Sequence, residues 1–166
     1  MTLANRITLL RIFLIPLCIA LLLSKLLGLA AVVFLILSLS DAVDGYVARR
    51  YNQVSEIGKM LDPLADKILV ISVLIGLTSI GKADPIAVML ITAREFIIAS
   101  VRGKKIFAAS PIAKWKTTLQ IIAVLMLLFS IPLANEVLWL AVLLSLLSGG
   151  VYLWQSQLLS QLRQSR

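Results

Sequence analysis

Long apolar runs separated by short polar segments set the pattern of this chain. Between Ile12 and Ser40 the only charged residue is Lys25. A single helix over that run would be roughly 44 Å long at about 1.5 Å per residue, whereas the hydrocarbon core of a bilayer is about 30 Å thick. The run therefore predicts two helices joined by a hairpin at Lys25–Gly28.

The other apolar runs predict four more helices. To reach spanning length, the two helices of the hairpin must extend back to Thr8 and forward to Ala48. The later helices are expected at about 60–80, 85–101, 117–133 and 136–157. The fold class predicted is an all-α integral membrane protein, a bundle of six transmembrane helices formed by a single domain, residues 1–166.

Composition supports lipid as the solvent for much of the surface. The chain is 60% apolar with a mean hydropathy of +1.01, whereas soluble domains are about 45–50% apolar. A chain of 166 residues cannot bury that excess, because small domains have too much surface for their volume. The single cysteine, Cys18, excludes a disulfide framework. The absence of histidine removes the commonest general base and any histidine-based metal site.

The distribution of positive charge predicts the orientation. An even number of spans puts both termini on one side of the membrane, and lysine and arginine in short loops mark the cytoplasmic side. Only Lys25 and Lys82 fall on the other side. The cations on the side of the termini are Arg6, Arg11, Arg49, Arg50, Lys59, Lys67, Arg94, Arg102, Lys104, Lys105, Lys114, Lys116, Arg163 and Arg166. We therefore expect a multi-pass protein of the cell membrane with both termini cytoplasmic. Its net charge of +8 is expected to set this orientation and to attract anionic lipids or an anionic substrate; no nucleic acid is expected as a partner.

Four aspartates fall within the predicted second and third helices. Asp41 and Asp44 are three residues apart, and Asp62 and Asp66 are four apart, so each pair shares one helix face. The short loop between the helices brings both pairs to the same cytoplasmic end. One interpretation is an ion-pair network with nearby basic side chains. The other is a site for a hard divalent cation, which prefers oxygen ligands. Spacing supports metal binding without naming a reaction.

The two segments that carry these aspartates resemble a family signature. Residues 41–49 and 58–66 fill all eight fixed positions of the pattern D-x2-D-G-x2-A-R-x8-G-x3-D-x3-D, which is the signature of the CDP-alcohol phosphotransferases. Members of that family are six-helix membrane enzymes whose active site opens to the cytoplasm. They cleave the pyrophosphate of a CDP-linked donor, release CMP and join the phosphoryl lipid to an alcohol.

The resemblance implies roles for individual residues. Asp41, Asp44, Asp62 and Asp66 would bind Mg²⁺ or Mn²⁺, as two ions, and Asp66 would also be the base that deprotonates the attacking hydroxyl. The residues implied to lie around the nucleotide are Thr8, Gly45, Ala48, Arg49 and Gly58. The two glycines would admit the nucleotide close to the helix backbone, or serve close helix packing. Arg49 would contact a phosphate or mark the membrane interface.

A second set of cations points to an acceptor that carries its own phosphate. Arg94 and Arg102 are eight residues apart and lie roughly on one helix face, and Lys114 opens the next helix from the same side, so the three are expected near one pocket. Arginine suits such a pocket because it forms bidentate contacts with phosphate. Pairing with the adjacent Glu95 is the alternative for Arg94. Residues 5–16, 93–98 and 114–120 resemble the family members that use sn-glycerol 3-phosphate, which implies CDP-diacylglycerol and glycerol 3-phosphate as substrates. A homodimer is also implied by the resemblance alone.

Two groups of alternatives remain open. Within the family, the acceptor would be inositol phosphate, which fits the cations equally well, or phosphatidylglycerol, or serine, which lacks the phosphate that the cations favour. Outside it, a divalent-cation transporter also places aspartates in spans, but its site should lie near the midplane. Helix six, with Gly149-Gly150, carries no chemistry of its own and is expected to serve packing or dimerisation.

Overall fold

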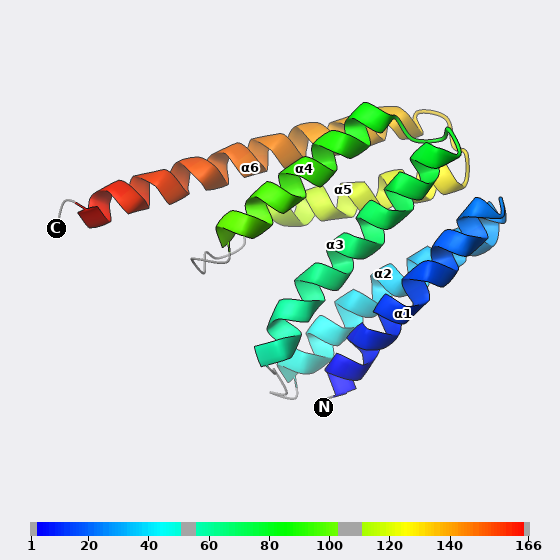
Figure 1. Cartoon of the computed structure of the whole chain (residues 1–166), viewed down its shortest axis with the longest axis horizontal. Coiled ribbons are helices and arrows are strands. Elements are labelled where there is room, and N and C mark those ends of the chain that lie inside the picture. The colour runs from blue at the N-terminus through cyan, green and yellow to red at the C-terminus, as the bar shows by residue number, and fades with distance from the viewer. Residues whose placement is uncertain (1–2, 51–55, 103–110, 165–166) are drawn as a thin grey trace.

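The protein is all-helical wherever the structure describes it. The structure is a computed structural model that describes residues 3–50, 56–102 and 111–164, with side chains at positions 10–40, 65, 67–100, 115–152 and 154. Its helices are α1 (Leu3–Leu23), α2 (Leu27–Arg50), α3 (Glu56–Ser79), α4 (Pro85–Arg102), α5 (Pro111–Leu128) and α6 (Ala134–Gln164) (Figure 1). The all-α prediction with six helices is confirmed for these residues.

The hairpin between the first two helices forms where the sequence predicts it. Lys25 adopts a left-handed backbone conformation with φ of 61°, and its amide donates to the carbonyl of Leu22 at 2.9 Å. The amide of Leu26 donates to the carbonyl of Leu21 at 3.0 Å. These bonds satisfy carbonyls at the end of α1. The chain then reverses and begins α2 at Leu27.

The boundaries of α5 differ from the prediction of 117–133. The helix begins six residues earlier, at Pro111, because proline suits the first helical turn, where its missing N–H costs nothing. It ends at Leu128, before a turn in which Ser130 and Leu133 have φ of 54° and 66°. Pro132 has no N–H and disfavours helix at the residue before it. The predicted end was wrong because the apolar run continues through this turn.

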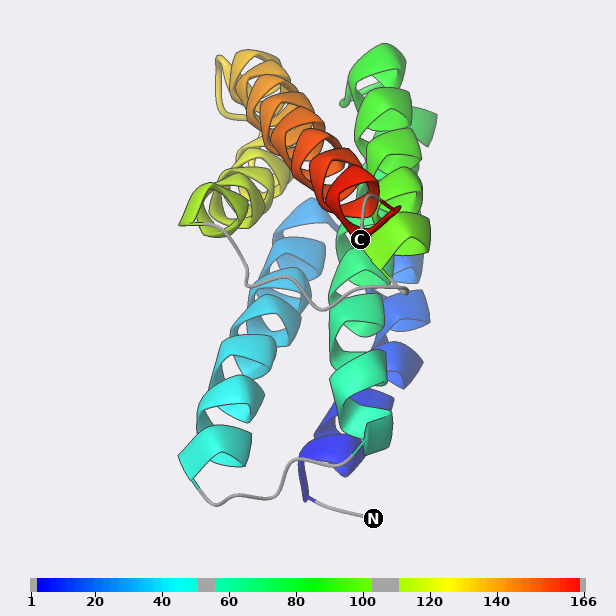
Figure 2. The same ribbon diagram turned by 90° about the vertical axis from the view of Figure 1, so that its left-hand side faces the viewer.

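The helices pack as two groups of three. In the first, α1 contacts both α2 and α3; in the second, α6 contacts both α4 and α5. Contacts of α3 with α4 and α5, and of α2 with α5, join the groups (Figures 1 and 2). The buried core runs through both and is built from aliphatic side chains with Phe34 as its largest apolar residue.

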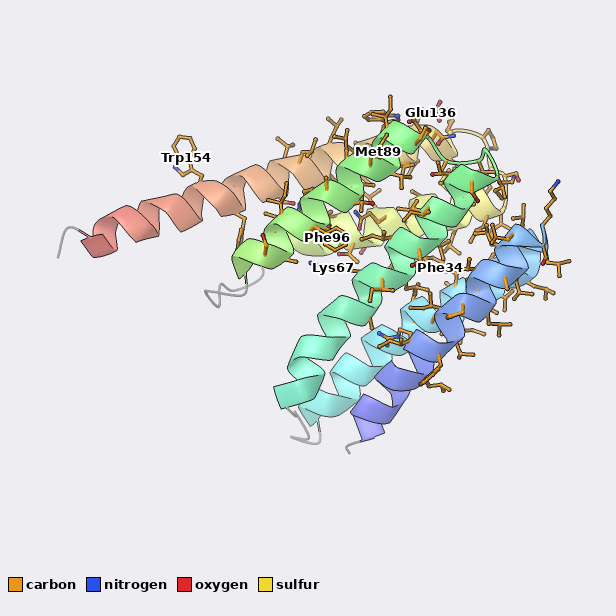
Figure 3. The ribbon with its side chains drawn as sticks, viewed as in Figure 1. Phe34, Lys67, Met89, Phe96, Glu136 and Trp154 are labelled. Carbon is orange, nitrogen blue, oxygen red and sulfur yellow. The ribbon has the colours of Figure 1, made fainter. Side chains whose placement is uncertain are left out.

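Large apolar side chains also cover the outside of the molecule. Phe13, Phe96, Leu147 and Trp154 are all exposed, and Trp154 points away from the other helices (Figure 3). Among the described residues, Ala134–Tyr152 is the one helical stretch long and apolar enough to cross a membrane. Shorter apolar helical stretches are Leu10–Leu23, Leu27–Ser40, Lys67–Ser79 and Trp115–Leu128.

A polar cluster joins the α3–α4 turn to the beginning of α6. Asp84 caps α4, its Oδ1 accepting the amide of Ile86 at 2.8 Å, and its Oδ2 accepts the indole N–H of Trp139 at 3.2 Å. Asn135 bridges the two segments by accepting the amide of Asp84 at 3.0 Å and donating to the carbonyl of Lys82 at 3.2 Å. The cluster lies at the end of α3 and the beginning of α4, away from the motif aspartates.

The cap predicts a pH dependence of stability. The amide of Ile86 holds the pKa of the Asp84 carboxyl below its ordinary value of 3.8. Because the folded-state pKa is lowered, the carboxylate stabilises the fold above its unfolded-state pKa, and this contribution is lost as pH falls through the folded-state pKa. We expect the melting temperature of the wild type, followed by circular dichroism in detergent, to drop more between about pH 6 and pH 3 than that of Asp84→Asn, whose amide caps without titrating. Equal drops would contradict this.

Candidate functional site

The four motif aspartates lie on two helices that meet at one end of the molecule. Asp41 and Asp44 are in the last turns of α2, and Asp62 and Asp66 are in the first turns of α3. The end of α2, the beginning of α3 and the N-terminal end of α1 share this end in both views (Figures 1 and 2). The side chains of the aspartates lie outside the described residues, so their coordination of metal stays a prediction.

The donor set fits the predicted cation by its chemistry. Four carboxylates on adjoining helix ends supply only oxygen ligands, which Mg²⁺ and Mn²⁺ prefer. Among the side chains that the structure describes, no three acidic, cysteine or histidine groups come together; the motif aspartates are not in that set. Gly45, Ala48 and Arg49 lie in α2, Gly58 in α3 and Thr8 in α1, so all are helical, and their roles around a nucleotide also stay predictions.

Arg11 joins α1 to the part of α2 that precedes the motif aspartates. Its side chain is only 2% exposed, and its Nε donates to Ser40 Oγ at 3.3 Å. Ser40 immediately precedes Asp41 in α2. Arg11 was expected at the cytoplasmic boundary of the membrane. Burying an arginine is costly without polar partners, and Ser40 is one such partner. The structure therefore shows a buried cation beside the predicted metal site.

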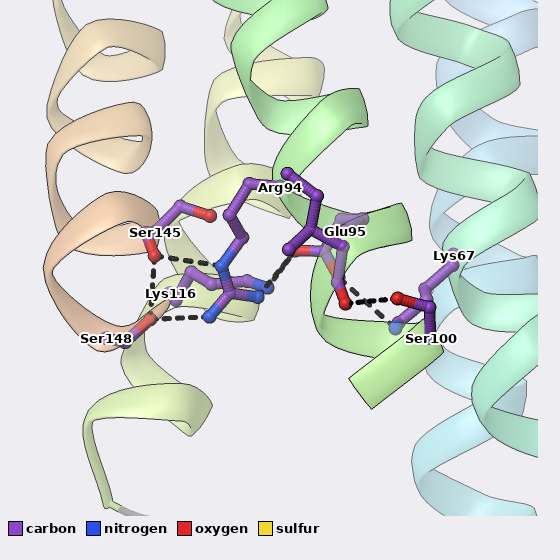
Figure 4. A network of polar contacts seen from close by, with 8 residues as sticks. Lys67, Arg94, Glu95, Ser100, Lys116, Ser145 and Ser148 are labelled. Carbon is purple, nitrogen blue, oxygen red and sulfur yellow. Dashed lines mark hydrogen bonds and ion pairs between the residues drawn. The ribbon is translucent and has the colours of Figure 1, made fainter. Parts of the chain in front are cut away.

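Arg94 is held between α4 and α6. Its Nε donates to the carbonyl of Ser145 at 2.9 Å, its Nη2 to Ser148 Oγ at 2.8 Å and its Nη1 to Glu95 Oε1 at 3.1 Å (Figure 4). A guanidinium has five N–H groups, and these bonds use three. The pairing of Arg94 with Glu95 is therefore present, and the remaining donors are compatible with the predicted phosphate contact.

Gly149 creates the space in which Arg94 lies. A Cβ at this position would be 3.0 Å from Arg94 Nε and 3.5 Å from its Cγ. A side chain at this position would push the arginine away by a few tenths of an ångström, whereas glycine lets it lie against α6. The expectation that Gly149 serves packing is confirmed, and its packing partner is the arginine side chain.

Glu95 forms ion pairs with three basic side chains from three helices. Its carboxylate is buried and contacts Lys67 of α3 at 3.4 Å, Arg94 of α4 at 3.1 Å and Lys116 of α5. Lys116 is itself only 6% exposed. Through Arg94 the same cluster reaches α6 (Figure 4). One carboxylate thus connects four helices, and we call Lys67, Arg94, Glu95 and Lys116 the Glu95 cluster.

The structure brings some of the predicted acceptor-site residues toward one region. Arg102 ends α4, two turns after Arg94, and Lys114 lies in the first turn of α5, two residues before Lys116. The side chains of Arg102 and Lys114 lie outside the described residues. Lys67 and Lys116 were not predicted as site residues. The signal that could have found them is a charged residue inside or beside an apolar span, which favours a functional role by default.

Comparison with known proteins gives the family. Residues 1–147 match the family described as CDP-alcohol phosphatidyltransferase. The chain is 38% identical to the CDP-diacylglycerol–glycerol-3-phosphate 3-phosphatidyltransferase of Rickettsia bellii, over 90% of this chain and 92% of the relative. It is 42% identical to the protein of the same name from Bacillus subtilis, over 74% of this chain and 70% of that relative. The chain belongs to the CDP-alcohol phosphatidyltransferase family.

Proposed function

We propose that this protein transfers the phosphatidyl group of CDP-diacylglycerol to sn-glycerol 3-phosphate, giving phosphatidylglycerol phosphate and CMP. The observation that carries the proposal is the complete aspartate signature on α2 and α3, in a chain that aligns over most of its length with relatives named for this reaction. The acceptor-specific resemblance and the cations of α4 and α5 support glycerol 3-phosphate over acceptors that lack a phosphate.

The chain's own groups divide the chemistry between them. Asp66 accepts the proton of the acceptor hydroxyl, whose oxygen then attacks the phosphorus that bears diacylglycerol. A new P–O bond forms, the pyrophosphate bond breaks and CMP leaves. Arg94, Arg102 and Lys114 hold the acceptor's phosphate, while the small residues Gly45, Ala48 and Gly58, with Thr8 and Arg49, accommodate the nucleotide. Asp41, Asp44, Asp62 and Asp66 would hold two Mg²⁺ or Mn²⁺ ions, which supply charge neutralisation and lower the pKa of a bound hydroxyl.

The proposal places the six helices across the cell membrane. Exposed apolar side chains such as Phe13, Phe96 and Trp154 support lipid as the surrounding medium, because soluble proteins rarely expose extensive apolar surface. The excess of lysine and arginine at the ends that carry the motif supports a cytoplasmic active site and cytoplasmic termini. The homodimer implied by the resemblance is part of the same proposal.

Metal dependence follows from the all-aspartate ligand set. We expect chelation with EDTA to abolish CMP release by purified protein, and excess Mg²⁺ or Mn²⁺ to restore it, because four clustered carboxylates without cations repel both one another and the donor's pyrophosphate. The assay is CMP release before and after dialysis against chelator. Full activity after exhaustive chelation would contradict the assignment of the aspartates to metal.

The acceptor is tested by supplying the alternative acceptors one at a time to purified protein in detergent. CMP release from CDP-diacylglycerol is measured with glycerol 3-phosphate, inositol phosphate, serine or phosphatidylglycerol as the acceptor. The proposal expects release that depends on glycerol 3-phosphate. Release with one of the other acceptors instead would keep the metal site and overturn the substrate assignment.

A further inference from the structure

The Glu95 cluster has an excess of positive charge among the side chains that the structure describes. It contains three cations, Lys67, Arg94 and Lys116, around one carboxylate. Buried ion pairs contribute little net stability, because desolvation offsets the Coulombic attraction. Within the described part of the chain, the cluster holds two more cations than anions. This excess favours a role for the cluster beyond holding the helices together.

The cluster links the two groups that are proposed to contact the acceptor, the base and the phosphate-binding arginine. Lys67 directly follows Asp66, the proposed base, in α3. Arg94 is the proposed contact for the acceptor's phosphate, and it directly precedes Glu95 in α4. Glu95 Oε2 lies 3.4 Å from Lys67 Nζ, and Glu95 Oε1 lies 3.1 Å from Arg94 Nη1. One carboxylate thus bridges the helix segment of the base and the side chain that would hold the phosphate.

Lys116 keeps Glu95 in this bridging position. Its ammonium donates to Glu95 Oε1 from α5, and both side chains are largely buried. Arg94 is in turn fixed on its far side by Ser145 and Ser148 of α6. The carboxylate is therefore held by three basic side chains, which restrict its movement.

We propose that Glu95 is a positioning residue that fixes the distance between the base on α3 and the phosphate-binding arginine on α4, and so selects acceptors by the spacing between their hydroxyl and their phosphate. The inference rests on the proposed function. In glycerol 3-phosphate a three-carbon backbone sets that spacing. Holding the acceptor by both its hydroxyl and its phosphate orients the hydroxyl toward the donor phosphorus, and such orientation lowers a reaction barrier.

The test compares two acceptors that differ by one methylene group. The kcat/KM for glycerol 3-phosphate is divided by that for its homologue 3,4-dihydroxybutyl phosphate, with product formation followed by CMP release. We expect the wild type to favour glycerol 3-phosphate by about 10- to 200-fold, the discrimination typical of one methylene group. In Glu95→Gln the ratio should fall at least tenfold, because the amide no longer holds the cations and the spacing relaxes.

Two further variants separate positioning from stability. Glu95→Gln/Lys116→Gln removes one charge of each sign, so it keeps the excess of cations unchanged and should show the same loss of discrimination. Asp84→Asn makes the same carboxylate-to-amide change in the turn before α4, away from the cluster, and should keep the wild-type ratio. A purely structural role of Glu95 would lower kcat/KM for both acceptors equally.

The outcomes distinguish this inference from the proposed function. Wild-type discrimination in folded Glu95→Gln would overturn it, as would failure of both Glu95 variants to yield folded protein, which would assign Glu95 to stability. Complete loss of turnover on both acceptors in folded variants would assign Glu95 to the reaction centre and also overturn the positioning role. A wild type that releases no CMP with glycerol 3-phosphate would instead refute the proposed function.

Discussion

Asp66→Asn is expected to abolish transfer while the protein stays folded. The amide has nearly the shape of the carboxylate, but it cannot accept the hydroxyl proton and brings no negative charge to the proposed metal site. Loss of a general base typically lowers the rate by about 10²- to 10⁴-fold, and loss of a metal ligand adds to this. With no histidine in the chain, the commonest alternative base is absent. The measurement is CMP release under single-turnover conditions with saturating glycerol 3-phosphate and Mg²⁺.

The control for this prediction is the same substitution at the other end of the helices. Asp84→Asn removes a carboxylate from the α3–α4 turn, where the side chain caps a helix, and should leave turnover unchanged at neutral pH. Circular dichroism and thermal melting of both variants check the fold. Near-normal turnover of Asp66→Asn would remove this residue as the base, even if the metal site survived.

Arg94→Ala is expected to impair acceptor use more than donor use. A hydrogen bond to a charged group contributes about 1.5–3 kcal/mol, so loss of the phosphate contact should raise the KM for glycerol 3-phosphate by about 10- to 100-fold. The KM for CDP-diacylglycerol should change much less. The measurement is initial-rate kinetics with each substrate varied in turn. An unchanged acceptor KM would return Arg94 to a structural role between α4 and α6.

Gly149→Ala perturbs the same arginine without removing it. Because the added methyl group would meet Arg94 Nε at 3.0 Å, the guanidinium must shift by a few tenths of an ångström. We expect a smaller rise in the acceptor KM than in Arg94→Ala, with the same sparing of the donor KM. Gly150→Ala is the matched control, because a Cβ at that position would meet nothing within 4 Å among the described residues outside its own stretch of helix. An equal acceptor KM in Gly149→Ala and Gly150→Ala would contradict a role of Arg94 in acceptor binding.

The sequence predicts the helices wherever a polar residue interrupts an apolar run. Lys25 divides the first long run, and the hairpin forms at that residue; the segment 81–84, with its lysine and aspartate, likewise precedes α4, which begins at Pro85 as predicted. The end of α5 could not be read in this way, because the turn at 129–133 is as apolar as the helix before it. There the backbone restriction around Pro132 decides the boundary, and hydropathy carries no signal of it.

In the candidate site, the placement of the aspartates on the ends of two neighbouring helices is predictable, because their spacing within each helix and across a short loop is local information. Their binding of metal stays a prediction. The Glu95 cluster is not predictable in this way, because its contacts join residues from three helices, and only the Arg94–Glu95 pair is adjacent in sequence. Pairing of Arg94 with Glu95 is one of the alternatives that the sequence leaves open, whereas the bonds of Arg94 to Ser145 and Ser148 of α6 join residues 51 and 54 positions apart, for which no local pattern carries a signal.

The most direct test of the proposed activity follows the acceptor into lipid. Purified protein in detergent is incubated with CDP-diacylglycerol, Mg²⁺ and radiolabelled glycerol 3-phosphate, and the organic phase is extracted. We predict that label enters the lipid in a one-to-one ratio with CMP released, that the labelled lipid is phosphatidylglycerol phosphate, and that Asp66→Asn shows neither. Release of CMP without label in the lipid, or no release from folded protein, would contradict the account.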